Sequence, residues 1–244
     1  MNLKKIINPF GGLTFYNENT VSTMLDAKEL MNDQNIDGSL VLTDYQSGGM
    51  GRIYGRRWLS KPGENLMFTL VLSMDYLGHG YSTVPLKTGL ALCKTVKELT
   101  KLDAKVKWPN DIVVDGKKLS GVLCQSKGQS ILIGVGININ QLDFDNEIKD
   151  KATSFSLLTN NGYNLEMVLS EFLSKFNQVL KDENWLSDLN SHLYKLGETV
   201  SFAKGNANSG EIITGKLEGL DGSGRVVILK ENGEVENFLS GEFL

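Results

Sequence analysis

Apolar residues recur with a helical period in three segments of the chain. The segment 22–31 places Met24 and Ala27 on one side and begins with two hydroxyl residues that suit a helix cap. The segment 83–100 carries an apolar stripe behind an early proline, and 165–181 has the clearest amphipathic pattern in the chain. The pattern therefore predicts a helix in each of these three ranges.

Short apolar runs rich in β-branched or aromatic residues predict the strands. Two of them occupy 39–43 and 66–73, and a nearly continuous apolar run with two glycines, SILIGVGININ, occupies 130–140. The stretch 106–124 breaks at a proline, resumes as a strand and returns after Asp115-Gly116, which predicts a hairpin.

The pattern changes near Gly197. From there the short runs ETVSFA, EIITGKLE, GRVVILK and EVENFL follow one another, separated by turn signals at 208–210, 221–222 and 232–233. Four short strands in so small a segment predict a separate β-barrel.

Composition removes several classes of function. The chain has 244 residues, 41% hydrophobic and 22% charged, as folded globular proteins do, and its net charge of −4 does not favour nucleic acid or an anionic membrane. Two distant cysteines, Cys93 and Cys124, and no long apolar targeting segment suggest a reducing cytoplasm. Those cysteines and two histidines, His79 and His192, make no zinc ligand set.

Between two predicted strands lies TDYQSGGMGRIYGRRW, residues 43–58. Its glycines let backbone N–H groups point inward, and Arg52, Arg56 and Arg57 add fixed positive charge, so the loop suits an anion. It matches neither the phosphate-binding loop of nucleotide hydrolases nor the dinucleotide fingerprint. The alternative is a solvated surface loop.

Lys107 precedes Trp108-Pro109-Asn110-Asp111. One interpretation is a turn that leaves Lys107 in solvent; the other is a rigid backbone that projects the lysine into a pocket as a point charge. Lys117 and Lys118, in the hairpin, are by default solvated.

Neutral polar residues form a second group. Ser22, Thr23 and Gln46 are suited to an uncharged polar ligand head group. Asn138, at the end of the glycine-containing strand, either recognises an amide or purine edge or satisfies turn backbone.

In order along the chain, YQSGGMGR..GRRW, KWPNDI, GKKLSGVL and IGVGININ resemble the biotin–protein ligase family, and the segment after residue 194 resembles its C-terminal SH3-like barrel. The likeness runs from about Ser22 to the last residue. It implies an α+β fold: a mixed sheet flanked by helices in 1–194, related to class II aminoacyl-tRNA synthetases and lipoate ligases, and a small barrel in 195–244.

The resemblance also implies a reaction. Biotin and ATP would form biotinyl-5′-AMP with Mg²⁺ present, and a lysine of a biotin carboxyl carrier domain would then take the biotin. Because negative charge concentrates on phosphate and acyl oxygens in both steps, fixed cations should carry much of the catalysis. We expect a cytoplasmic monomer or homodimer.

The implied site residues follow position by position. The catalytic residues are Lys107 and Arg52. Those around biotin are Ser22, Thr23, Gln46, Gly49, Met50, Gly51, Arg52 and Lys107, and those around ATP or the adenylate are Arg52, Arg56, Trp58, Lys118 and Asn138. Magnesium would be held mainly by the phosphates of ATP.

Four positions depart from the family pattern. Met50 stands in the place of the first loop arginine, Ile53 in that of another basic residue, and Tyr54 resembles an insertion. Met24 stands where the family often has asparagine. These changes bear on how the intermediate is held, but Arg52 and Lys107 are retained.

About twenty residues precede Ser22, too few for the winged helix that some relatives carry, so we expect a short form without DNA binding. Three rivals remain: a lipoate or octanoate ligase, a non-catalytic regulator that binds biotin or nucleotide, and a structural β-barrel adaptor, which would explain only the last segment.

Overall fold

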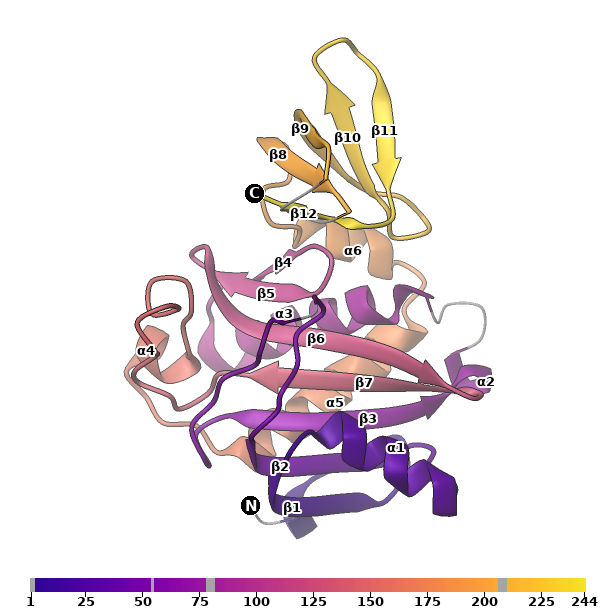
Figure 1. Ribbon diagram of the computed structural model, residues 1–244, viewed down its shortest axis with the longest axis vertical. Coiled ribbons are helices and arrows are strands. Elements are labelled where there is room, and N and C mark those ends of the chain that lie inside the picture. Colours follow the sequence, from indigo (N-terminus) through magenta and orange to yellow (C-terminus); the bar gives the residue numbers. More distant parts are fainter. Residues whose placement is uncertain (1–2, 54, 78–81, 206–209) are drawn as a thin grey trace.

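The computed structural model describes residues 3–53, 55–77, 82–205 and 210–244, and two β-sheets form its framework (Figure 1). In spatial order, the large sheet consists of β1 (Thr14–Thr20), β2 (Leu40–Gln46), β3 (Leu66–Ser73), β7 (Ser130–Ile137), β6 (Lys117–Lys127), β5 (Asp111–Val114) and β4 (Lys105–Lys107). Strands β1 and β2 are parallel, and the other neighbours are antiparallel. The predicted mixed sheet is confirmed.

Helices cover both faces of the large sheet. Helix α1 (Thr23–Asp33) packs on β2, β3 and β7 from one side, while α3 (Val84–Thr100) and α5 (Leu165–Lys181) pack together on the other, as Figure 1 shows. Strand alternation divides the core accordingly: Leu40 and Leu42 belong to the α3–α5 side, whereas Val41 joins the smaller cluster beneath α1. The shorter elements are η1 (Leu3–Lys5), α2 (Met74–Leu77), α4 (Phe155–Thr159) and α6 (Trp185–Ser191).

The predicted helix starts have a visible cause. The Ser22 hydroxyl accepts a hydrogen bond from the Met24 N–H at the start of α1, and the Asn164 side chain accepts one from the Met167 N–H at the start of α5. The three predicted helices are therefore confirmed. Among the described residues, no helix is long and apolar enough to cross a membrane.

The small sheet stands at the β4–β5 edge of the large one (Figure 1). Its order is β11 (Val235–Phe238), β10 (Val226–Lys230), β9 (Ile212–Leu220), β8 (Thr199–Lys204) and β12 (Gly241–Phe243), all antiparallel, as in a small SH3-like domain. Residues 208 and 209 of one predicted turn lie outside the described ranges.

Strand β12 was not predicted. It pairs with β8 because Gly241 has no side chain: a Cβ there would lie 2.2 Å from the ring of Phe202. The close approach brings the last strand of the small sheet back against the large one, where its residues reach the pocket described next.

Candidate functional site

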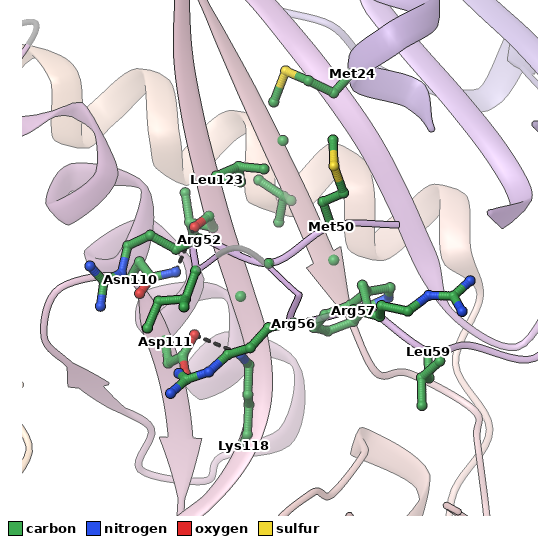
Figure 2. A pocket seen from close by; sticks show the side chains of 18 of the residues that line it. Met24, Met50, Arg52, Arg56, Arg57, Leu59, Asn110, Asp111, Lys118 and Leu123 are labelled. Carbon is green, nitrogen blue, oxygen red and sulfur yellow. Dashed lines mark hydrogen bonds and ion pairs between the residues drawn. The ribbon is translucent and has the colours of Figure 1, made fainter. Parts of the chain in front are cut away.

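A cavity of about 750 Å³ lies beside the start of α1, and Figure 2 shows it from close by. Its walls come from the loop after β2, the β4–β5 turn, strands β6 and β7, and the last strand of the small sheet. Methionines 24 and 50 gather at one end in Figure 2, and Arg52, Arg56 and Lys118 at the other. The pocket therefore has an apolar end and a cationic end.

The neutral polar residues form an ordered unit near α1. The Gln46 amide oxygen accepts hydrogen bonds from the Thr23 N–H (2.8 Å) and the Thr23 hydroxyl (3.1 Å). The backbone donor fixes which way the amide points, so the Gln46 NH₂ group is left to donate. The Thr23 hydroxyl is itself 2.9 Å from that of Thr69. This end of the pocket presents fixed donors to an uncharged carbonyl oxygen.

Two side chains of the protein itself pack directly on the two glycines of β7. A Cβ at Gly134 would lie 2.9 Å from the Met24 methyl, and one at Gly136 would lie 2.5 Å from the Trp58 ring. These two side chains therefore occupy the space that the glycines leave on the strand. The buried Nε1 of Trp58 has no hydrogen-bond partner among the described residues, which leaves a donor for a ligand.

The Gly/Arg loop folds back on itself as a short hairpin. The Gly51 N–H donates to the Arg56 carbonyl (2.8 Å), and the Trp58 N–H donates to the Gly49 carbonyl (3.0 Å). At its tip, Arg52 and Arg56 both bind the carboxylate of Glu242 in β12, at 3.0 and 2.9 Å. Two of the arginines predicted to bind an anion thus bind an acidic side chain from the small domain.

The lysines sit around the β4–β5 turn. Lys118 forms an ion pair with Asp111 at 2.7 Å. Lys107 ends β4, opposite Asp111 in the backbone ladder, and also lines the pocket. Of the pocket's five basic side chains, only that of Lys107 has neither an ion pair nor a hydrogen bond to a described residue.

The charged side chains of the pocket and the state of the two cysteines limit the reactions that the site can support. Five basic and three acidic side chains line the pocket, an excess that favours a ligand with several negative charges. Burial raises the pKa of the Cys124 thiol to about 12, and burial also raises the pKa of Cys93, so neither is a thiolate nucleophile near neutral pH. No group of three potential metal-binding side chains occurs within the described ranges.

Most of the residues singled out in the sequence meet here. The pocket is lined by Ser22, Thr23, Gln46, Met50, Gly51, Arg52, Arg56, Trp58, Lys107 and Lys118. Gly49 lies behind them, against Gln46 and Trp58. Asn138 is buried outside the lining, and its amide donates to the Thr153 carbonyl at 3.0 Å. Its contact with adenine stays a prediction, and Tyr54 lies outside the described residues.

Sequence reasoning missed all three acidic side chains of the pocket, Asp111, Glu147 and Glu242. Asp111 carried a detectable signal, because the hairpin register places it opposite Gly121 and close to Lys118. Glu242 carried none, since its approach to the arginines depends on how the two sheets pack.

Family models match two parts of the chain: the biotin/lipoate A/B protein ligase family over residues 16–141 and the biotin protein ligase C-terminal domain over residues 195–244. Among solved structures, a biotin protein ligase from Aquifex aeolicus in complex with biotin and ATP is 32% identical, with a TM-score of 0.82, covering 96% of this chain and 98% of that one.

Among curated proteins, the bifunctional ligase/repressor BirA of Bacillus subtilis is 29% identical over 93% of this chain and 72% of its own length. A biotin–[acetyl-CoA-carboxylase] ligase of Mycobacterium tuberculosis is 30% identical over 49% of this chain and 45% of its own length. With the first model matching more than half of its residues and the Aquifex fold reproduced along nearly all of it, the chain belongs to the biotin/lipoate A/B protein ligase family.

Proposed function

We propose that this protein is an ATP-dependent ligase that activates biotin as biotinyl-5′-AMP and transfers it to a lysine of a carrier domain. The observation that carries the proposal is one pocket that combines fixed neutral donors at Gln46 with an excess of cations around Lys107. The similarity to an enzyme solved with biotin and ATP, and the matching C-terminal domain, support biotin over lipoate.

The first step joins two anions. An oxygen of the biotin carboxylate forms a bond to the α-phosphorus, and the bond to pyrophosphate breaks. Lys107 lacks a counter-ion among the described residues, so its ammonium is available to the charge that develops there. Arg52 and Arg56 are available to the phosphate oxygens once they leave Glu242.

The second step breaks the mixed anhydride. The amine of the acceptor lysine attacks the acyl carbon, an amide bond forms, AMP leaves with the electrons of the carbon–oxygen bond, and the nitrogen loses a proton. The pocket must hold the intermediate until the acceptor arrives, a role that suits the Gly/Arg loop in its wall.

The site suits magnesium that arrives already bound to the nucleotide. Two of the pocket's three carboxylates, those of Asp111 and Glu242, form ion pairs with Lys118 and with the two arginines, and the described residues offer no cluster of three metal ligands. We therefore propose that Mg²⁺ is held mainly by the phosphates and water, where it would neutralise the departing pyrophosphate.

Pyrophosphate exchange into ATP tests the proposal directly. Biotin should stimulate exchange and lipoate should not, and the purified protein with ATP and magnesium should then label a biotin carboxyl carrier domain. Exchange with lipoate alone would assign a lipoate ligase, and biotin binding without labelling would assign a regulator.

We also propose that the chain does not bind operator DNA, which its net charge of −4 supports. A salt-sensitive, sequence-specific shift in the mobility of operator DNA would contradict this.

Replacing Gln46 by leucine should raise the KM for biotin about tenfold or more with a smaller effect on the KM for ATP. The side chain would lose its NH₂ donors and leave the buried Thr23 donors without their acceptor. Gln141, a buried glutamine outside this pocket, offers a matched control as Gln141→Leu. Equal increases in both KM values for Gln46→Leu would show general disruption instead of loss of biotin contacts.

A further inference from the structure

We propose that Trp108 is a positioning residue through which the small C-terminal sheet fixes Lys107 in the pocket. The inference rests on the proposed function, in which the Lys107 ammonium meets the developing charge. It assigns to the neighbouring tryptophan a task that is distinct from filling the core.

The side chain of Trp108 is anchored in the other domain. It is 3% exposed, and its indole N–H donates to the carbonyl of Gly224 at 3.0 Å. Its ring lies 5.9 Å from that of Phe202 in β8, which in turn contacts the ring of Phe243 in β12 at 5.5 Å. The residue that follows Lys107 is therefore held by the small sheet.

The residue before Lys107, Val106, is held by the C-terminal part of the chain as well. Strand β4 has only three residues, and β5 occupies one of its edges. On the other edge, the Val106 N–H donates to the His192 carbonyl (2.8 Å), and the Tyr194 N–H donates to the Val106 carbonyl (3.0 Å). His192 and Tyr194 belong to the segment that leads into the small sheet. Lys107 is thus bracketed by two attachments to the C-terminal part of the chain.

The carbonyl that receives the indole is itself fixed. Gly224 ends a tight turn in which the Asp221 carboxylate accepts hydrogen bonds from the Ser223 and Arg225 N–H groups. Gly224 has φ of +78°, and a Cβ there would lie 2.6 Å from Leu86 in α3. The turn is wedged against the helix, so the acceptor cannot shift without moving other atoms.

This arrangement matters because the Lys107 ammonium has no partner among the described residues to hold it in place. A lysine side chain is flexible, so its average position follows the backbone that carries it. A displacement of about 1 Å in a catalytic group can cost about a hundredfold in rate. The indole hydrogen bond of Trp108 tethers the residue that directly follows Lys107.

A double-mutant cycle tests the proposal. Trp108→Phe keeps an aromatic ring against Phe202 but removes the N–H, and should lower the kcat of biotin-dependent adenylation about tenfold, in line with loss of positioning. Combined with Lys107→Ala, it should have almost no further effect, because the group that it positions is gone. Trp185→Phe, at a half-buried tryptophan outside the pocket, is the matched control and should leave kcat unchanged.

Equal fold-losses from Trp108→Phe with and without Lys107 would overturn the proposal, as would an unchanged kcat. Thermal melting separates folding from function. Any loss of stability caused by Trp108→Phe should be the same with Lys107 and with alanine at position 107, whereas the loss of kcat should differ. If Trp108→Phe does not fold, Gly224→Ala, which displaces the same carbonyl, takes its place in the cycle with the same expected outcome. A wild-type protein that fails in the exchange assay would instead remove the proposed function itself.

Discussion

Replacing Lys107 by alanine is expected to slow adenylate formation by two to three powers of ten, a loss of about 3 kcal/mol or more of transition-state stabilisation. The structure sharpens the reason, since among the described residues this is the pocket cation with neither an ion pair nor a hydrogen bond. No described neighbour therefore offsets the charge of Lys107. Biotin-dependent pyrophosphate exchange and single-turnover formation of the adenylate measure the effect.

Lys105 provides the control for that substitution. It lies on the same strand, but outside the pocket, where it forms an ion pair with Asp103 at 3.2 Å. Lys105→Ala should leave exchange nearly unchanged, because its ion pair with the 63% exposed Asp103 contributes little and its hydrogen bond to the Ser191 carbonyl is long, at 3.3 Å. Lys107→Arg should recover only part of the rate, since guanidinium and ammonium groups differ in shape and reach. Unchanged turnover in Lys107→Ala would remove this residue from the mechanism.

Replacing Arg52 by alanine is expected to release biotinyl-adenylate about ten to a hundred times faster while adenylation itself suffers less. The charged hydrogen bond that Arg52 makes with Glu242 indicates what it can offer a phosphate, and such a bond contributes about 1.5–3 kcal/mol. Free intermediate in solution, measured in the absence of an acceptor, reports the leak. Arg56→Ala should have a smaller effect, because its side chain is 60% exposed against 32% for Arg52.

Retention that is unaltered in Arg52→Ala would mean that other groups close the pocket. Met50 is the first candidate, because it stands on the same loop and points into the cavity near Met24 in Figure 2. Methionine supplies apolar contact where an arginine would supply charge. The release rate of Arg52→Ala therefore shows whether the arginine charge or apolar contact retains the intermediate.

The sequence predicted the elements that are defined by local periodicity and capping, such as α1, α3 and α5. It missed β1, because the strand reads TFYNENT and its edge position allows four consecutive polar residues. It missed β12 because three residues carry too little pattern, and their pairing with β8 depends on a glycine approach.

The candidate site divides in the same way. Residue types and the family resemblance singled out Gln46, Arg52 and Lys107, and the structure places all three in one pocket; their roles stay predictions. Asn138 was a harder case, since a strand-end amide can serve a ligand or the backbone, and here it donates to Thr153. The ion pairs of Glu242 could not be predicted, because they join positions almost two hundred residues apart across two sheets.

Because of those ion pairs, the arginines of the pocket already have a partner before any nucleotide binds. Glu242 pairs with both Arg52 and Arg56, and its side chain is only 13% exposed. An incoming phosphate therefore exchanges one partner for another and gains the difference between two interactions, not the whole of one. If the protein binds ATP as proposed, Glu242 of the small domain would compete with the nucleotide for the two arginines. The affinity for ATP would then depend both on the attraction of Arg52 and Arg56 and on the free energy needed to separate them from Glu242.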